Sequence, residues 1–190
     1  NVNIIKYQNI EPKIDKSVKL ALSSIIIGNT IINKNTVIGD SVVVRGDGEC
    51  ISIGKNCTLK SASTVHVASN FLGTKIGDNC MIEKYCVIHA CELGNGVLVG
   101  ENSVVMDGSI VGNNSVILPN TLVPPRKVFK KNSLIGGAPA KLINKIDLKL
   151  YDSFLNKNSK KSNEYKLLSD VSYTKHLKKQ DLNFKKLNKI

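Results

Sequence analysis

The chain has 190 residues, and its 27 Lys and Arg residues exceed its 15 Asp and Glu residues, which gives a formal net charge of +12. This length predicts one compact domain with a terminal extension, and no stretch approaches the roughly 18 uninterrupted apolar residues of a membrane-spanning helix. The Lys residues are interleaved with Asn and only 5% of the residues are aromatic, so the basic character does not indicate a nucleic-acid-binding protein.

The first segment, residues 1–17, carries scattered charge and a proline at position 12. We expect an irregular lead-in here, which runs into the following domain or packs along it. Because the chain begins with Asn1 instead of Met, we also expect that a preceding segment is missing, together with any targeting signal that it held.

The dominant pattern between positions 27 and 123 is an aliphatic residue at every sixth position. A spacing of six fits neither the 3.6-residue period of an α-helix nor the 2.0-residue period of a strand. A fixed short repeat predicts a solenoid, whose units must stack to bury their apolar faces. We therefore expect a β-solenoid over residues 18–140, with three hexads in each turn and residues about eighteen apart in contact. The repeating residues are Ile27, Ile32, Ile38, Val44, Ile53, Leu59, Val65, Ile76, Ile82, Ile88, Leu93, Val99, Val105, Val111, Ile117 and Val123, with five-residue steps after Ile27 and Ile88 and longer interruptions after Val44 and Val65.

The remaining positions of each hexad suit a narrow triangular coil. A small residue such as Cys80, Cys86 or Ser103 stands four positions after the aliphatic residue, where little volume is available. Gly and Asn near the start of each hexad suit corners, because both tolerate positive φ.

Three segments depart from this pattern. Residues 67–75 break the period, which predicts a loop expelled from one corner. Prolines 119, 124 and 125 predict the end of the regular coil, because proline cannot donate to a strand ladder. Beyond Lys141 the apolar spacing becomes that of an amphipathic helix, so residues 141–190 are predicted to form a basic, helical segment that contacts neighbouring subunits or lipid headgroups.

The five cysteines are odd in number and form no Cys-x-x-Cys motif. This pattern indicates neither a disulfide framework nor a thiolate zinc site. We interpret the cysteines as small, reduced core residues, which argues against an oxidising compartment.

Two pairs of residues carry candidate chemistry. His66 and His89 each follow an inward aliphatic residue, and they are 23 residues apart, which places them on one edge of neighbouring turns. Imidazoles in that position can ligate zinc, although a hydrogen-bonded surface or interface role is the simpler interpretation. Arg45 and Asp47 extend from one corner and predict an Arg–carboxylate contact within or between subunits.

The chain resembles a γ-class carbonic anhydrase-like protein over residues 25–146. The matching pieces are Val-Val-Val-Arg-Gly-Asp at 42–47, the hexads that run to His66 and His89, and Gly-Gly-Ala-Pro-Ala-Lys at 136–141 followed by a helix. The resemblance implies a trimer of left-handed parallel β-helices, with zinc held between subunits by three histidines. The left-handed coil comes from the resemblance, and it is an exception to the usual right-handed crossover.

The resemblance places two ligand positions at His66 and His89, and the middle ligand at Lys84. Lysine is a three-donor cation, and catalytic zinc needs three protein ligands beside its open position. The amides that orient zinc-bound hydroxide in that family are replaced by Thr58 and Lys60. No catalytic residue and no resident cofactor are therefore expected, and we predict that the chain alone is not an enzyme.

The same resemblance retains Arg45 and Asp47, which form contacts between subunits in that family. It also leaves open one zinc at a heteromeric interface, where a partner would add the histidine that Lys84 replaces.

The main functional prediction is a structural one. The resemblance implies a catalytically impaired scaffold subunit of a heterotrimer with two related β-helix subunits, on the matrix side of mitochondrial respiratory complex I. A first alternative is a hexapeptide subunit like those at the pointed end of dynactin, with a cytoplasmic location, because residues 60–65 and 81–88 resemble such a subunit. A second alternative is an enzyme: either a hexapeptide acyltransferase that uses acetyl-CoA, with His66 or His89 as general base, or a carbonate dehydratase that is active only at a heteromeric interface.

Overall fold

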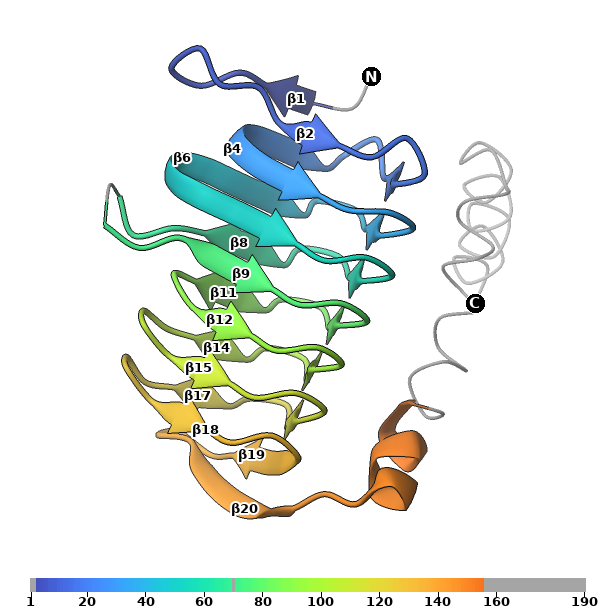
Figure 1. The fold of residues 1–190 in the computed structure, drawn as a ribbon, viewed down its shortest axis with the longest axis vertical. Helices are drawn as coiled ribbons and strands as arrows, with labels where there is room; N and C mark the ends of the chain where they lie inside the picture. Colours follow the sequence, from blue (N-terminus) through green and yellow to red (C-terminus); the bar gives the residue numbers. More distant parts are fainter. Residues whose placement is uncertain (1–2, 70, 156–190) are drawn as a thin grey trace, which may run out of the picture. The chain divides into compact units, whose positions relative to one another are not determined.

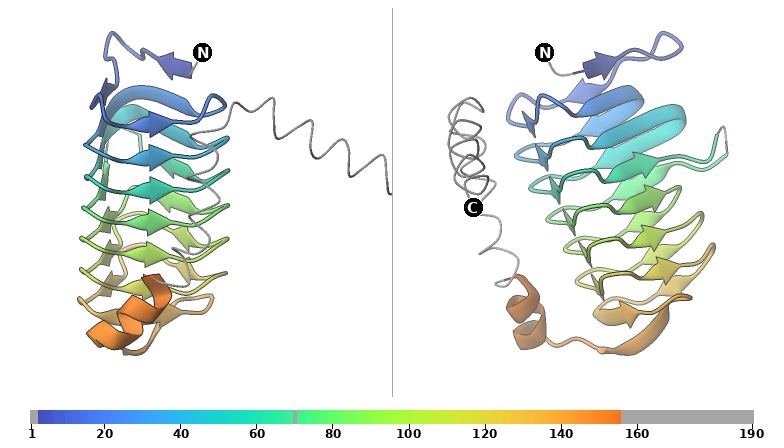
Figure 2. Two further views of the ribbon diagram at one scale, coloured as in Figure 1. Left: turned by 90° about the vertical axis from the view of Figure 1, so that its right-hand side faces the viewer. Right: turned by 180° about the vertical axis from the view of Figure 1, so that it is seen from behind.

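A computed structural model describes residues 3–69 and 71–155 of the chain. The residues up to Asp147 form one unit, a left-handed β-solenoid in which short parallel strands stack from turn to turn (Figure 1). The predicted fold class is confirmed. Figure 2 shows the same stack from the side, with the strands of successive turns in line.

The solenoid has three faces. The first face consists of β1 (Asn3–Ile5), the first halves of β4 (Ile25–Ile32) and β6 (Val43–Ile53), β8 (Thr64–His66), β11 (Val87–His89), β14 (Val104–Val105) and β17 (Leu122–Val123). The second face consists of β2 (Lys13–Ile14), the second halves of β4 and β6, β9 (Thr74–Ile76), β12 (Glu92–Leu93), β15 (Ile110–Val111) and β18 (Val128–Phe129). The third face consists of β3 (Lys19–Leu20), β5 (Val37–Ile38), β7 (Thr58–Leu59), β10 (Met81–Ile82), β13 (Leu98–Val99), β16 (Val116–Ile117), β19 (Ser133–Gly136) and β20 (Lys141–Lys145).

The predicted aliphatic ladder forms the core. Ile32, Ile88 and Leu93 are almost completely buried, so the five-residue step after Ile88 lies in the solenoid as predicted. The predicted five-residue step from Ile27 to Ile32 is wrong, because the inward residue is Ile26. Ile26 is buried, whereas Ile27 is partly exposed on the outer surface. Ile26 stands six residues before Ile32, so the period extends without a break into the first described turns.

The corners use Asn and Gly for different reasons. Asn35, Asn56 and Asn79 have φ of 58°, 56° and 57° and form a side-chain ladder along one corner. Gly77 is not among the residues with positive φ; instead, a Cβ there would lie 2.7 Å from the backbone nitrogen of Asn95 in the next turn. Glycine at this hexad position therefore permits close stacking of turns, which differs from the predicted reason.

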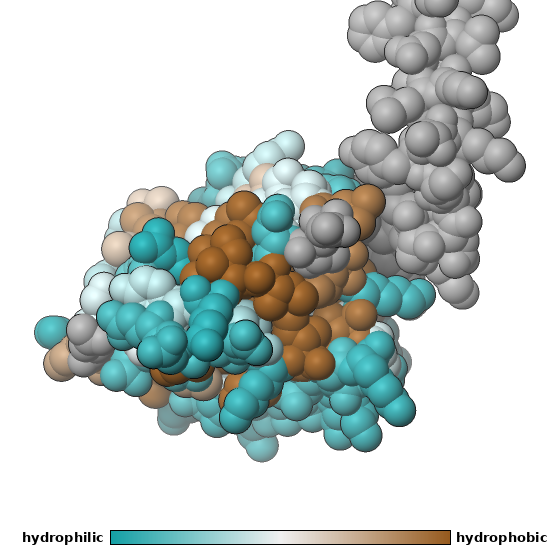
Figure 3. Space-filling model, turned by 90° about the horizontal axis from the view of Figure 1, so that it is seen from above, coloured by the Kyte–Doolittle hydropathy of each residue, from teal (hydrophilic) through white to brown (hydrophobic). Residues whose placement is uncertain are grey.

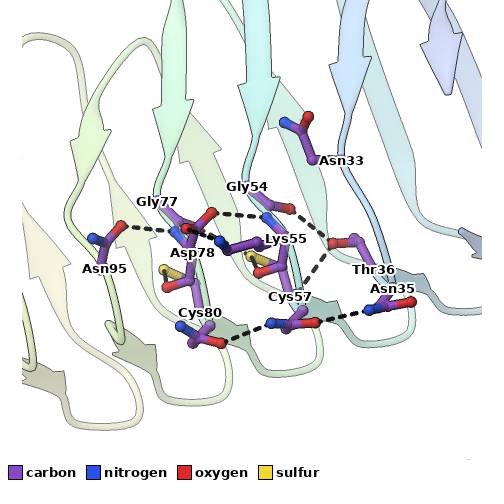
Figure 4. A network of polar contacts seen from close by, with 12 residues as sticks. Asn33, Asn35, Thr36, Gly54, Lys55, Cys57, Gly77, Asp78, Cys80 and Asn95 are labelled. Carbon is purple, nitrogen blue, oxygen red and sulfur yellow. Dashed lines mark hydrogen bonds and ion pairs between the residues drawn. The ribbon is translucent and has the colours of Figure 1, made fainter. Parts of the chain in front are cut away.

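Side chains and backbone groups link successive turns at this corner (Figure 4). The Oδ1 atom of Asn95 accepts a hydrogen bond from the Asp78 nitrogen, and the Oδ1 atom of Asp78 accepts one from the Lys55 nitrogen, both at 2.9 Å. The hydroxyl of Thr36 donates to the Gly54 carbonyl at 2.8 Å and accepts from the Cys57 nitrogen at 3.1 Å. These contacts satisfy backbone groups that a sharp corner leaves outside the strand ladders.

The ends of the domain differ from the expected boundaries. Residues 1–17 contain β1 and β2, which pair in parallel with β4, so strand pairing begins before position 18. Leu20 and Ile14 stand eighteen residues before their partners Ile38 and Ile32, which is the spacing of one turn. The prolines at 119, 124 and 125 lie at or beside corners, and the coil continues through β19.

The segment after Lys141 also differs from the prediction. Residues 141–145 form β20, antiparallel to β19, because the edge of β19 offers backbone groups that need partners. The predicted helix occupies 148–155, in the second unit. The rest of the predicted helical tail, with its lipid contact, lies outside the described residues. No helix in the described ranges is long and apolar enough to span a membrane.

The predicted loop at 67–75 is confirmed in outline. It leaves the corner after β8 and returns to β9, and an isolated bridge joins Ala68 and Leu72. Figure 1 shows this loop projecting from the coil.

Candidate functional site

The first face aligns three predicted site residues in one outward column. Arg45 lies opposite His66, and His66 lies opposite His89, in the parallel registers of β6, β8 and β11. Each follows a buried residue, Val44, Val65 or Ile88, because successive side chains of a strand point to opposite sides.

These residues form a continuous hydrogen-bonded chain with two aspartates. Arg45 donates from Nε to Oδ2 of Asp47 at 2.7 Å, and Oδ1 of Asp47 lies 2.8 Å from Nε2 of His66. Nδ1 of His66 lies 3.2 Å from Nε2 of His89, and Nδ1 of His89 lies 2.6 Å from Oδ1 of Asp107. We call these five residues the histidine chain.

The two carboxylates determine which ring nitrogens act as donors in the histidine chain. Ionised carboxylates only accept hydrogen bonds, so the nitrogen of each ring that faces Asp47 or Asp107 is the donor in that contact. The other two nitrogens, Nδ1 of His66 and Nε2 of His89, face each other.

Among the five residues of the histidine chain, Asp47 is the least exposed, with a side chain that is 10% exposed. Burial raises the pKa of its carboxyl, but hydrogen bonds from His66, from the backbone and from Arg45 outweigh burial. The net result is that the pKa of Asp47 lies below its ordinary value, so this carboxylate stays ionised beside His66.

The structure places the other predicted positions elsewhere. Lys84 lies at the corner before β11, where its carbonyl accepts a hydrogen bond from the Asn102 nitrogen. Lys84 is not one of the five residues that form the histidine chain within residues 3–69 and 71–155. Thr58 is an outward residue of β7 on the third face. Whether a partner subunit brings Lys84 opposite the histidines of a neighbour stays a prediction.

Lys60, the other replaced position, has an unexpected environment. Its side chain is 1% exposed, and its Nζ lies 2.5 Å from Oε1 of Glu83, whose side chain is 7% exposed. Glu83 Oε2 is buried, and it has no hydrogen-bond partner within residues 3–69 and 71–155. We call these two residues the buried ion pair; it joins the turns that contain β7 and β10.

Sequence reasoning missed Asp107 and the buried ion pair, although both obey the turn spacing. Asp107 stands 18 residues after His89, and Glu83 stands 23 residues after Lys60, the same step that separates His66 from His89. Applying the 23-residue step to every polar residue between β7 and β11 would have identified the pair.

The arrangement provides part of a metal site. The two ring nitrogens that face each other belong to different turns, and the other nitrogen of each ring is held by a carboxylate, as in the outer shell of zinc sites. The residues therefore fit two imidazole ligands. No cluster of three or more His, Cys, Asp or Glu residues suited to a metal occurs in the described ranges, so a third ligand would have to come from another chain.

A cavity of about 310 Å³ lies on the second face, beside Leu72 and Gly73 where the loop returns to β9. Its lining includes Cys50, Leu72, Cys91, Glu92 and Ile110, and it includes neither histidine. The cavity and the histidine chain are therefore separate features on two sides of one corner.

An outward apolar ladder lies beside the histidine chain on the first face. Its half-exposed members occupy consecutive turns in parallel register, and five of the six are apolar; they are Ile25, Val43, Thr64, Val87, Val104 and Leu122. The equivalent ladder on the second face is interrupted by Ser52, Lys75 and Glu92, the last two joined at 3.1 Å, which lie between Ile31 and the exposed Ile110 and Val128. The first face thus carries an unbroken run of half-exposed, mostly apolar side chains beside the charged histidine chain, and an apolar centre with a polar rim is compatible with a protein interface.

Comparison with known families matches residues 5–168 to the family model of dynactin subunit 5. Comparison with curated protein sequences finds no match. Two solved structures are similar over most of their length. One is a hexapeptide transferase family protein from Anaplasma phagocytophilum, with 30% identity, a TM-score of 0.77, and 84% of this chain and 93% of that chain covered. The other is a putative acetyltransferase from Bacillus cereus, with 26% identity, a TM-score of 0.81, and 88% and 99% covered.

Proposed function

Because the chain belongs to the dynactin subunit 5 family of hexapeptide-repeat proteins, we propose that it is a non-catalytic subunit of a dynactin-like assembly. The observation that carries this proposal is the family match over residues 5–168. In this proposal the solenoid is a rigid scaffold, and its first face contacts a neighbouring subunit.

The geometry of the histidine chain supports a scaffold. A histidine acting as general base in acyl transfer needs a ring nitrogen free to accept a proton from the substrate. Both ring nitrogens of His66 and both of His89 are engaged by groups of this chain. The same contacts hold Asp47 and Arg45 in place at the rim of the apolar ladder, where a partner can meet them.

The family match favours this assignment over the respiratory-complex role that the resemblance to γ-class carbonic anhydrases implied. The family match agrees with the first alternative from the sequence, a subunit like those at the pointed end of dynactin, which residues 60–65 and 81–88 suggested. A mitochondrial location and a trimer with two related subunits remain predictions, and localisation to microtubules or to mitochondria discriminates between the two assemblies.

The proposal is tested by purifying the native assembly through a tag placed after Ile190 and identifying its subunits by mass spectrometry. We expect further subunits of a dynactin-like complex, each in fixed stoichiometry with this chain. Recovery of respiratory-complex subunits, or of this chain alone, would refute the proposal. An acetyl-CoA binding assay on the same material checks the transferase alternative, and we expect no binding.

A second candidate role is a structural zinc at an interface. It is favoured by the convergence of Nδ1 of His66 and Nε2 of His89, which are 3.2 Å apart. These residues would supply two ligands, and a neighbouring chain would supply the third. Metal analysis of the purified native assembly tests this role: we expect stoichiometric zinc that is lost in a His66→Ala variant with the subunits retained. Absence of zinc from the wild-type assembly rejects it.

A further inference from the structure

The last strand of the solenoid, β20, offers an outer edge. It pairs with β19 in the antiparallel direction and is the terminal strand of its sheet (Figure 1). Within residues 3–69 and 71–155, no other strand pairs with it. A free strand edge presents N–H and C=O groups that can bind a further strand. The return of the chain thus covers the edge of β19 and creates a new edge on β20.

Both ends of β20 are anchored in the coil. The residue before it, Ala140, is 3% exposed, and its nitrogen donates to the Leu122 carbonyl at 2.8 Å. The residue after it, Ile146, is 5% exposed, and its nitrogen donates to the Asn132 carbonyl at 2.8 Å. All five residues between these anchors are exposed. An edge that is ordered before binding loses little conformational entropy when a partner adds to it.

The surface of the last turn, residues 124–147, is strongly basic. Its basic residues are all exposed, and Asp147 is the only acidic residue in its sequence. The basic residues are Arg126, Lys127, Lys130, Lys131, Lys141 and Lys145. This concentration of positive charge favours a partner that carries negative charge.

The opposite end of the coil has a different surface. Figure 3 looks onto that end and shows apolar side chains gathered between polar ones, and its exposed residues include Ile4 and Leu22. β20 also exposes two apolar side chains, Leu142 and Ile143, but these lie between the lysines at its two ends. A partner of β20 must therefore match positive charge as well as apolar surface.

A second copy of the chain is a poor match for β20. In an antiparallel pairing centred on Ile143, Lys141 of one copy would lie opposite Lys145 of the other, and like charges in that position are destabilising. Ile143 is also the extra residue where the pairing with β19 shifts register, and lysines and bulges both protect an edge strand against identical edges. Residues 156–190 of the same chain match no better, because they contain many more Lys than Asp and Glu residues.

A phosphate-bearing partner, such as a lipid headgroup or a nucleic acid, matches only the lysines. Phosphate oxygens accept hydrogen bonds, but they provide no donor for the C=O groups of β20. An extended polypeptide offers both donors and acceptors along its backbone. The combination of a strand edge with basic side chains therefore favours a protein partner.

We propose that β20 and the lysines around it bind an extended, acidic segment of a different protein chain, which adds to the sheet as a further strand. Main-chain hydrogen bonds to β20 provide affinity, and carboxylates that face Lys141 and Lys145 provide specificity. Leu142 and Ile143 contact apolar residues between the partner's acidic ones. This surface lies on the third face, so the inference goes beyond the first-face contact of the proposed function and does not depend on it.

The proposal is tested in the native assembly with a photo-crosslinking residue placed at position 143 of the full chain, and at position 110 as a control. Both positions hold isoleucine, 55% and 43% exposed, but Ile110 lies on the second face. We expect position 143 to crosslink to an acidic stretch of a different protein chain, and position 110 not to reach that stretch. Crosslinks from position 143 to a second copy, to residues 156–190, to lipid or nucleic acid, or to no other molecule would overturn the proposal.

Charge reversal provides the second measurement. We expect Lys141→Glu combined with Lys145→Glu to weaken retention of the crosslinked partner by about tenfold, because two attractive cross-strand pairs become repulsive. As a control, Lys34→Glu combined with Lys55→Glu changes the net charge equally at exposed positions of another corner and should retain the partner. Both variants should keep the circular dichroism spectrum of the wild type.

Full retention by the variant of β20 would contradict this docking site. That result would leave the proposed function standing, because the proposed function is decided by which subunits the wild-type chain recovers. Recovery of an acidic partner through β20 from an assembly unrelated to dynactin would have the opposite meaning, since it supports the docking site and refutes the proposed function.

Discussion

Two sets of charged residues connect neighbouring turns of this solenoid, and they differ in where they lie. The buried ion pair of Lys60 and Glu83 is 1% and 7% exposed, with its charged atoms 2.5 Å apart. The histidine chain crosses the same turns, but its ends, Arg45 and Asp107, are 52% and 43% exposed. Each set contains a contact between residues 23 positions apart, Lys60 with Glu83 and His66 with His89. The same spacing of turns therefore brings both pairs together.

The difference separates stability from recognition. A charge taken out of water must keep its partner or the fold loses several kcal/mol. A charge at the surface gains little from its partner, about 0–1 kcal/mol in the median case, and stays available to another molecule. We therefore expect the buried ion pair to maintain the coil, and the histidine chain to contribute mainly to contacts outside it.

The largest expected effect concerns the buried ion pair. Lys60→Ala or Glu83→Ala alone should lower the free energy of unfolding by about 3–5 kcal/mol, because each removes one member of the buried ion pair and leaves the other charge in the core. Urea denaturation of the purified chain measures the loss. As a control, Lys60→Met combined with Glu83→Leu should recover most of it, since that variant buries no charge at this position. A loss below about 1 kcal/mol in the single variants would contradict the distinction between the two sets.

The next effect compares neighbours on one strand. Ile88 is completely buried and His89 points outward from β11. Ile88→Ala should cost about 2–5 kcal/mol of unfolding free energy through a cavity in the core, whereas His89→Ala should cost no more than about 1 kcal/mol. Thermal and urea unfolding of the two variants gives both values. Equal destabilisation would show that the histidine chain maintains the coil as strongly as the core does.

A smaller effect depends on pH through Asp47. Because the pKa of Asp47 is lower in the folded chain than its ordinary value near 3.8, the folded state binds fewer protons there than the unfolded state does. Its stabilising contribution, about 1 kcal/mol, is therefore complete above this ordinary value and is lost as the pH falls through the lower, folded-state value. Comparing urea unfolding of the wild type and Asp47→Asn across this range should show a difference that disappears in acid. A difference that persists unchanged at the lowest pH would contradict the assignment.

The smallest effect concerns the thiols. All five cysteines are free; Cys50 is partly exposed and the other four are buried. Burial raises the pKa of Cys86 to about 11 and that of Cys91 to about 12, so little reactive thiolate forms there at neutral pH. Iodoacetamide should therefore modify Cys50 in the folded chain and the other four only after unfolding, as read by peptide mass spectrometry. Rapid modification of Cys86 under native conditions would show that the coil opens locally.

The sequence allowed the fold to be predicted because each buried position obeys one local rule. Ile32, Ile88 and Leu93 recur at a spacing that only a short-repeat solenoid explains, and the structure buries all three. The pairing of His66 with His89 followed from the same turn arithmetic. The same spacing relates Asp107 to His89 and Glu83 to Lys60, but no motif in the sequence distinguishes these two acidic residues from the other charged residues of the coil.

What the sequence could not provide is decided by contacts between distant segments. Residues 141–145 have apolar spacing that suits a helix, yet they form β20, because the edge of β19 needs a hydrogen-bonding partner. The sequence of residues 1–17 does not show the repeat, because this segment has few inward apolar residues and several of its exposed residues are apolar. The role of Lys84 depends on a neighbouring chain, about which the periodicity of one chain carries no information.

The most direct test of the account replaces His66 and His89 together by Ala in the full chain, tagged after Ile190 and purified from its source cells. Unfolding free energy and subunit composition are measured on the same preparation. The account predicts a folded chain within about 1–2 kcal/mol of the wild type that recovers a neighbouring subunit about tenfold less well. A variant that keeps every neighbour at wild-type stoichiometry would contradict the claim that the first face is a contact surface.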